Sequence, residues 1–379
     1  MSYFSTLTKL TRNNMILKRI CCLAAALAIV VPSFAGINRN EVKEIADRVA
    51  DWQIANFKNV SYTGKKRAPL DWANGALFRG MVEWSAKTGY QPAEDFVMNI
   101  AKTHDWHMAR RLYHADDICV GQAFLLLYEK YKDPVMLQYI KERADSVIDF
   151  RSHVAMDIHV KGGQERWCWC DALFMAPPVY SMLTQITGDR KYVDFMNEEF
   201  VATTNHLFDT EYKLYYRDAR YFDKTEANGA KVFWGRGNGW CYAGLTFLLE
   251  TTPESDPMYD YFKSLYLKMT EAVLKCQDAN GSWHASLLAP ENYPTAENSS
   301  SGFMTYGLAW GVNHGILKGK VYRKAVEKGW KALCSYVRED GKLEYVQPVA
   351  GSPGKITKDM TEVYGVGAFL LAATEMLDF

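Results

Sequence analysis

The sequence lacks an excess of charge of either sign. Its 379 residues contain 44 lysines and arginines and 44 aspartates and glutamates, so the formal net charge at pH 7 is zero. Proteins that bind the phosphate backbone of a nucleic acid usually carry a strongly basic surface. We therefore expect no nucleic-acid partner.

The chain also lacks the short motifs of several enzyme classes. No G-x-S-x-G, H-E-x-x-H, Walker or G-x-G-x-x-G motif occurs in a supporting context, which argues against a serine hydrolase, a zinc protease and a nucleotide-binding enzyme. The eight cysteines do not have the spacing of a zinc site or of a disulfide framework. The sequence thus predicts no metal and no cofactor.

Long apolar runs are scarce, and the one near the amino terminus is short. Residues 21–31 (CCLAAALAIVV) follow four basic residues and precede small residues at positions 33–35. This order is typical of a secretory signal peptide, and about a dozen apolar residues are too few to cross a bilayer. We predict that residues 1–35 are a signal peptide, that no membrane span remains after cleavage, and that the mature chain is periplasmic or secreted.

What the chain does have is a repeated apolar pattern. Segments rich in glycine and alanine recur at intervals of roughly 45 to 65 residues, and they begin at Trp72, Val120, Asp171, Gly237, Ser300 and Tyr364. Between them lie six stretches that carry charge on one face, as in residues 41–57, 132–150 and 320–337. Helices that are apolar on nearly all sides must be buried, and one-sided helices cover them. The pattern therefore predicts twelve helices that alternate between an inner and an outer position.

Repeating units of this length are typical of stacked helical hairpins. Six hairpins that close on themselves form an all-α (α/α)6 barrel, which we expect as a single domain over residues 36–379. An open solenoid is the alternative, but neither end carries the polar capping repeat that a solenoid needs. Strand signals are sparse, with one short pair expected near residues 213–222.

Polar residues gather just before three of the predicted inner helices. They form the segments HADD (residues 114–117), RWCWCD (166–171) and FWGRGNGW (233–240). In a closed barrel these helix N-termini converge on one face, where anions are favoured. Carboxylates for proton transfer, an arginine for a substrate carboxylate and rings for sugar faces would together suit a sugar-acid site. The 11 tryptophans and 23 tyrosines are consistent with a ring-lined site, although large barrels also contain many buried rings.

The three aspartates have a simpler interpretation as helix N-caps, a position that aspartate favours. Asp116 and Asp117 fit it well. Asp171 fits it less well, because it follows two tryptophans and two cysteines, where desolvation favours a protonated carboxyl group.

The basic candidates also have alternatives. Arg236 could pair with a buried acid, although the segments before the inner helices offer no other cation in a comparable setting. His114 and His284 are further candidates. A histidine beside a tryptophan, such as His284, is more often packed than catalytic.

At this point the residues resemble a known family. WCWCDALFMAPP is similar to the W-x-D-x-L-(F/Y)-M-x-x-P segment, and VFWGRGNGW to the W-x-R-G-x-G-W segment, of unsaturated rhamnogalacturonyl hydrolases, glycoside hydrolase family 105. Unsaturated glucuronyl hydrolases of family 88 are more distant relatives. HADDICVGQAFLLLYEKYKD and ENSSSGFMTYGLAWGVNHGIL are similar to the corresponding stretches, so the resemblance covers essentially the whole mature chain.

The resemblance implies an (α/α)6 barrel that removes a 4,5-unsaturated uronic acid, galacturonyl or glucuronyl, from the nonreducing end of polysaccharide-lyase products. In that family an aspartate protonates the C4=C5 double bond and activates water that adds at C5, and the resulting hemiketal rearranges. By position Asp171 matches the catalytic aspartate, and either Asp116 or Asp117 matches the second carboxylate. Arg236, Trp234 and Trp240 match the substrate-binding arginine and its flanking rings. Apart from the resemblance, we also expect Trp169, His114 and His284 to bind substrate.

One departure from the family pattern leaves the substrate open. Rhamnogalacturonyl-type members carry a histidine in a Y-H-x-x-D-like stretch, where this chain reads Tyr215-Tyr216-Arg217-Asp218. The sugar beyond the uronate could therefore be rhamnose or part of an arabinogalactan, an ulvan or another glycan. Two other functions compete: an inverting glycosidase on saturated glycosides, and an exported glycan-binding protein without turnover. No pattern indicates an oligomeric state.

Overall fold

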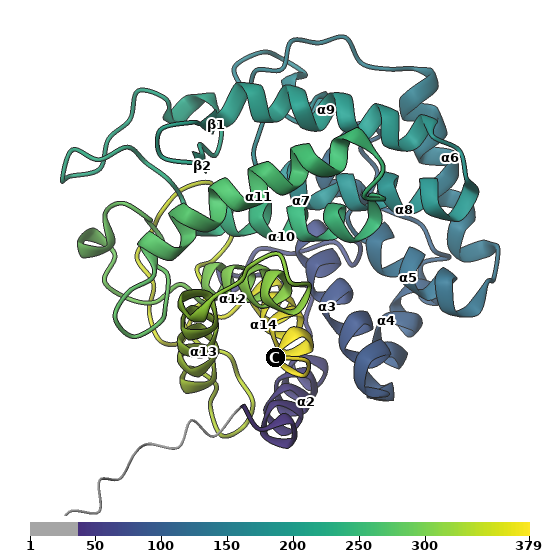
Figure 1. Ribbon diagram of the computed structural model, residues 1–379. Helices are drawn as coiled ribbons and strands as arrows, with labels where there is room; N and C mark the ends of the chain where they lie inside the picture. Colours follow the sequence, from purple (N-terminus) through teal and green to yellow (C-terminus); the bar gives the residue numbers. More distant parts are fainter. Residues whose placement is uncertain (1–36) are drawn as a thin grey trace, which may run out of the picture. The chain divides into compact units, whose positions relative to one another are not determined.

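The computed structural model describes residues 37–379 (Figure 1). The predicted signal peptide lies outside these residues. Among the helices of the described part, none is both long enough and apolar enough to span a bilayer.

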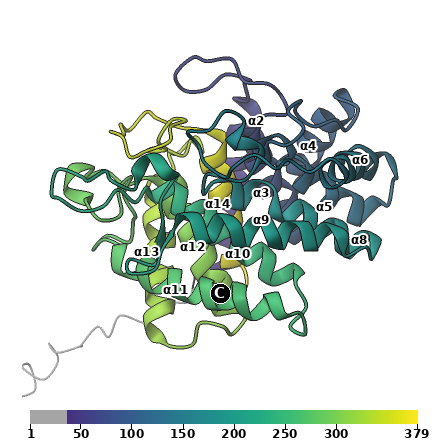
Figure 2. The same ribbon diagram turned by 90° about the horizontal axis from the view of Figure 1, so that it is seen from above.

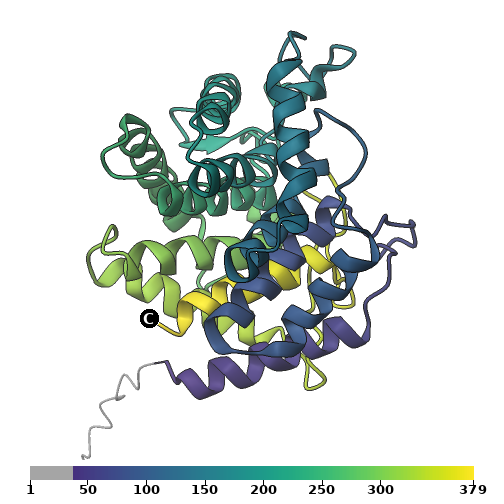
Figure 3. The same cartoon turned by 90° about the vertical axis from the view of Figure 1, so that its right-hand side faces the viewer.

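The helices of the described part form two rings. The inner ring contains α3 (Trp72–Thr88), α5 (Gly121–Tyr131), α7 (Ala172–Met175) followed by α8 (Pro177–Thr187), α10 (Gly235–Thr251), α12 (Asn298–Asn313) and α14 (Val363–Met376). The outer ring contains α2 (Arg39–Ala55), α4 (Gln91–Thr103), α6 (Val135–Asp149), α9 (Lys191–Leu207), α11 (Pro257–Cys276) and α13 (Lys320–Ser335). Each inner helix packs on the next, and α14 packs on α3. The ring is therefore closed, and the predicted all-α barrel is confirmed; Figure 3 shows the last helix beside the first ones.

Glycines in the inner helices allow their backbones to approach closely. A Cβ atom on Gly367 of α14 would lie 2.3 Å from the carbonyl oxygen of Ala76 in α3, and one on Gly80 would lie 2.6 Å from the carbonyl oxygen of Gly367. Gly244 of α10 meets the carbonyl of Leu173 in the same way. The small residues that marked the repeat thus lie at the contacts between inner helices.

The third inner segment is broken, whereas its sequence predicted one helix. α7 ends at Met175, and α8 begins with Pro177 and Pro178. Proline has no N–H to donate and is favoured in the first turn of a helix, so the pair ends one helix and begins another.

The remaining regular structure is small. Strands β1 (Phe208–Asp209) and β2 (Leu214–Tyr215) form an antiparallel hairpin with Phe208 opposite Tyr215, which confirms a short strand pair near the predicted stretch. Four 3-10 turns lie in connections that precede inner helices: η1 (Ala115–Ile118), η2 (Gly163–Glu165), η3 (Ala219–Tyr221) and η4 (Pro290–Asn292).

The connections differ in length at the two ends of the barrel. Those that follow inner helices are short turns, while those that precede them are long. We call the long connections, with the first turns of the inner helices, the N-terminal rim; its connections are residues 56–71, 104–120, 150–171, 208–234, 277–297 and 336–362. In Figure 2 the connections before α3 (purple) and α14 (yellow) lie on the same side of the molecule. The rim therefore gathers the polar segments that the sequence analysis selected.

Candidate functional site

Acidic residues stand at the beginning of most inner helices. Asp71, Asp171, Glu297 and Glu362 directly precede α3, α7, α12 and α14. Asp71 and Glu297 cap their helices by accepting backbone N–H groups. The Asp171 side chain accepts no such bond, so the N-cap interpretation is wrong for Asp171.

Asp116 is the carboxyl group that burial affects most clearly at this end. Burial, followed by repulsion from the Asp171 carboxylate, raises the pKa of Asp116 to about 8. Its side chain is 17% exposed. Asp116 therefore holds a proton at neutral pH, interacts with Asp171 and keeps some contact with solvent.

Asp117 is engaged differently from its neighbour. Its Oδ2 accepts the backbone N–H of Arg111 at 2.7 Å, and its Oδ1 accepts Nε and NH2 of the same arginine at 3.1 and 2.6 Å. The backbone hydrogen bond and the ion pair together occupy both oxygens. Of the aspartate doublet, Asp116 rather than Asp117 is thus available for a ligand.

Asp171 faces a cation that the sequence analysis missed. The Asp171 Oδ2 lies 3.4 Å from Nε of Arg217, and Arg217 also contacts Asp218 through NH1 at 2.5 Å. The expectation that no cation other than Arg236 has a comparable setting is therefore wrong. The departure from the family pattern at residues 215–218 was the signal that could have found Arg217.

His114 lies between the two aspartate segments. Its Nδ1 accepts the backbone N–H of Asp116 at 3.3 Å, and its ring packs on Trp169 with centroids 4.7 Å apart. Burial, with a smaller effect from Arg111, lowers the pKa of His114 to about 4. The ring is therefore neutral at physiological pH, its proton lies on Nε2, and this buried Nε2 has no hydrogen-bond partner among the described residues.

Arg236 lies beneath the connection before α14. Its side chain is fully buried, and NH1 and NH2 donate to the backbone carbonyls of Gln347 and Pro348 at 2.8 and 2.9 Å. The guanidinium stacks over the rings of Trp234 and Tyr364. In this arrangement Arg236 anchors a rim loop, and its binding of a substrate carboxylate stays a prediction.

The three predicted tryptophans are buried as well. Trp169, Trp234 and Trp240 are each no more than 2% exposed, and Trp240 packs against Phe303 and other inner rings. Their burial favours the packing interpretation over sugar stacking. Trp72, which stacks on Tyr364 at 5.4 Å, keeps part of its surface exposed and is a ring that the sequence analysis did not select.

His284 is held within its own connection. Its Nδ1 lies 3.0 Å from the carbonyl oxygens of Tyr293 and Thr295, and its Nε2 lies 3.2 Å from the Asp278 carboxylate. No contact joins it to Asp116 or Asp171 in the described structure. This geometry agrees with a packed histidine.

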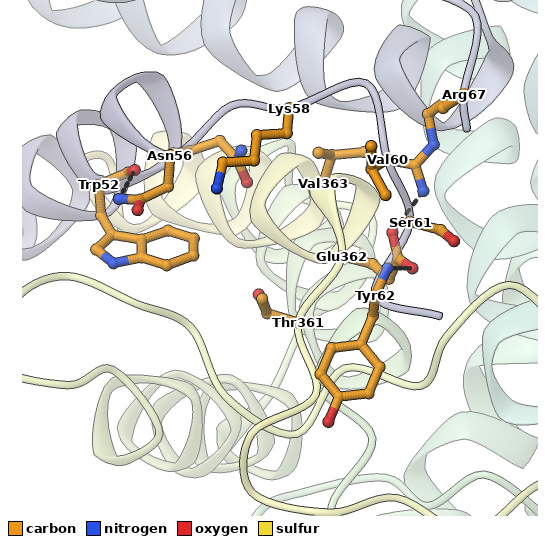
Figure 4. Close-up of a pocket in the computed structure, with 11 residues that line it drawn as sticks. Trp52, Asn56, Lys58, Val60, Ser61, Tyr62, Arg67, Thr361, Glu362 and Val363 are labelled. Atoms are coloured by element: carbon orange, nitrogen blue, oxygen red, sulfur yellow. Dashed lines mark hydrogen bonds and ion pairs between the residues drawn. The ribbon is translucent and has the colours of Figure 1, made fainter. Parts of the chain in front are cut away.

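A cavity of about 190 Å³ lies at the edge of the rim, between the connection before α3 and the start of α14 (Figure 4). Glu362 accepts hydrogen bonds there from the Arg67 side chain at 2.5 Å and from the Tyr62 backbone at 2.9 Å. Neither Asp116 nor Asp171 lines it. Within residues 37–379, no group of three or more histidine, cysteine or acidic side chains is placed to hold a metal ion.

Comparison with known proteins identifies the relatives of this chain. The family model described as Glycosyl Hydrolase Family 88 matches residues 45–379. The chain is 39% identical to an unsaturated 3S-rhamnoglycuronyl hydrolase of Alteromonas sp., over 88% of this chain and 85% of that protein. It is 34% identical to a protein of the same name from Formosa agariphila, over 94% and 96% of the two chains. A solved structure of a family 88 glycosyl hydrolase from Bacteroides vulgatus superimposes with a TM-score of 0.81 at 28% identity, over 90% of this chain and 99% of that chain.

Proposed function

The chain belongs to Glycosyl Hydrolase Family 88, and we propose on this premise that it removes a 4,5-unsaturated uronic acid from the nonreducing end of oligosaccharides made by a polysaccharide lyase. The observation that carries the proposal is the pair of interacting carboxyl groups, Asp116 and Asp171, of which Asp116 holds a proton at neutral pH. A protonated carboxyl group beside a second carboxylate is what acid and base steps at one substrate require.

The proposed reaction is the addition of water to the C4=C5 bond. Asp171 exchanges protons with the substrate, and Asp116 supplies the proton that the pair holds at neutral pH. C4 receives a proton, water adds at C5, and the second proton of that water returns to the carboxylate pair. The hemiketal at C5 then opens to a ketone, which leaves a hemiacetal at C1, and this hemiacetal releases the next sugar as an alcohol. One water is consumed and the carboxyl groups are regenerated.

The identity of the next sugar was open from the sequence. Two relatives that match most of this chain are named for a 3S-rhamnoglycuronyl unit. We therefore propose that the unsaturated uronate of the substrate is linked to the rhamnose unit that appears as "3S-rhamno" in the names of these relatives. Oligosaccharides that carry another sugar next to the unsaturated uronate serve as the control substrates, and their turnover is compared with that of the rhamnose-linked substrate.

One assay separates the candidate functions. Purified enzyme is mixed with lyase-made oligosaccharides, and the loss of ultraviolet absorbance of the conjugated double bond is followed together with release of the next sugar. The proposal expects both, with the fastest turnover for the rhamnose-linked substrate. Cleavage of saturated glycosides alone would indicate the inverting glycosidase, and binding without product would indicate a glycan-binding protein.

Export remains part of the proposal, since the order of residues 1–35 supports it. We propose that the mature chain begins near residue 36 and is periplasmic or secreted. Sequencing the amino terminus of the protein from fractionated cells tests this, because an intact residue 1 in the cytoplasmic fraction would contradict it.

A further inference from the structure

Arg217 has an unused donor edge directed at the proposed catalytic carboxylate. Its NH1 is bonded to Asp218, whereas its buried Nε has no hydrogen-bond partner among the described residues and lies 3.4 Å from Asp171 Oδ2. The side chain is 16% exposed. Nε and NH2 form the edge of a guanidinium that binds a carboxylate with two parallel hydrogen bonds.

The backbone holds Arg217 and Asp171 in register. The N–H of Cys170, the residue before Asp171, donates to the carbonyl oxygen of Arg217 at 2.8 Å. Asp218, which is fully buried, also accepts two bonds from the Arg220 side chain and one from its backbone. The position of the Arg217 guanidinium is thus set from both sides before any ligand arrives.

The chemistry of the substrate places an anion next to Asp171. A group that transfers protons at C4 and C5 must lie within hydrogen-bond reach of the reacting atoms. The uronate carboxylate is attached directly to C5, so it must lie beside Asp171 during the reaction. Two negative groups at this distance repel each other unless a cation lies between them.

We propose, resting on the proposed function, that Arg217 binds the carboxylate of the unsaturated uronate. The other rim arginines described above are engaged elsewhere: NH1 and NH2 of Arg236 donate to backbone carbonyls, and Nε and NH2 of Arg111 bind Asp117. Arg67 binds Glu362, and Arg220 binds Asp218. Nε of Arg236 and NH1 of Arg67 are also buried without a partner in the described structure, but of these arginines it is Arg217 that contacts Asp171. Arg217 therefore makes the enzyme specific for a uronate with a free carboxylate.

The test compares two variants on two substrates. Arg217→Gln and the control Arg220→Gln each remove one arginine from Asp218, but only Arg217 faces Asp171. Each is assayed on the lyase-made oligosaccharide and on the same compound with its uronate carboxylate methylated. We expect Arg217→Gln to lower kcat/KM by roughly 10- to 150-fold on the free acid, as for loss of a charge-assisted hydrogen bond, and by less than about threefold on the ester. Arg220→Gln should show the same small loss on both.

Further measurements keep the inference decidable. Inhibition constants of acid and ester, measured as competitors of turnover, give the same comparison even where the ester reacts slowly. Arg217→Lys preserves the charge, so its kcat/KM on the free acid should lie between the values of the wild type and of Arg217→Gln. It takes the place of Arg217→Gln if the glutamine variant folds poorly. Equal penalties on acid and ester would show that Arg217 only positions Asp171. If wild-type enzyme consumes neither unsaturated compound, the proposed function fails instead.

Discussion

Two sides of the N-terminal rim contain the same kinds of residue but use them differently. On the side of α5 and α7, Asp116, Asp171 and Arg217 retain partial exposure, and Arg217 Nε faces Asp171 without a hydrogen-bond partner in the described structure. Arg236 Nε on the other side also has no partner, but its side chain has no exposure. On the side of α10, α12 and α14, Glu297 is fully buried and accepts N–H and hydroxyl groups of its own helix together with the backbone N–H of Gln347.

The difference separates a reactive site from a structural one. A polar group whose partners are all internal holds chain segments together. A polar group that lacks a full set of partners and stays in contact with solvent can be completed by a ligand, and such groups gather at functional sites. An acid and an arginine near a helix N-terminus are therefore not enough to define the site.

The largest effect is expected from Asp171. Asp171→Asn should lower turnover by roughly 10²- to 10⁴-fold, because the amide cannot exchange protons with the substrate, while the thermal midpoint changes little. On the other side Glu297→Gln should lower the thermal midpoint and leave turnover per folded molecule near the wild-type value. Absorbance assays and thermal unfolding on both variants check the contrast, and near-normal turnover of Asp171→Asn would remove it from the catalytic role.

Substitutions of Asp116 and Asp117 should also differ in whether they affect turnover or stability. Asp116→Asn should lower kcat, whereas Asp117→Asn should mainly lower stability, because Asp117 binds Arg111. With a pKa of about 8, Asp116 loses its proton as the pH rises through that value, so the wild-type rate should fall there. The pH profile of Asp116→Asn should lack this alkaline fall; a loss confined to Asp117→Asn would reverse the assignment.

A substitution of Arg236 tests whether this residue stabilises the fold or binds the substrate carboxylate. Arg236→Lys keeps the charge but loses the planar pair of bonds to the carbonyls of residues 347 and 348. We expect a loss of about 1 to 3 kcal/mol in the free energy of unfolding and equal losses of kcat/KM on free-acid and esterified substrates. A deficit found only with the free acid would instead support the predicted carboxylate-binding role of Arg236.

The smallest effect is expected at the opposite end of the barrel. Burial raises the pKa of Glu375, near the end of α14, to about 7. The folded state then holds a proton that the unfolded state releases at lower pH, so this contribution to stability is lost as the pH rises from about 4.5 to 7. Chemical denaturation across that range should show a shallower decline for Glu375→Gln, with unchanged turnover at each pH where both are folded.

Much of the fold could be predicted because it depends on local patterns. The interval between the apolar segments and their glycine content indicated inner helices, and the charged stretches indicated outer ones. The proline pair at residues 177 and 178 was visible too, but its consequence was missed, because the apolar run continued across it. The convergence of the inner-helix N-termini on one face could be predicted from the direction of the helices alone.

The amino-acid sequence by itself determined the alternation of helices, the family and the segments that meet at the rim, since periodicity and motifs are properties of neighbouring residues. Only the tertiary structure decided which of those polar groups are free. Arg217 lies 46 residues beyond Asp171 in the chain, yet it faces that carboxylate because a backbone hydrogen bond joins the two connections. Arg236 matches the expected motif, yet the loop at residues 347 and 348 covers it. Exposure and hydrogen-bond partners depend on segments distant in sequence, and no local pattern records them.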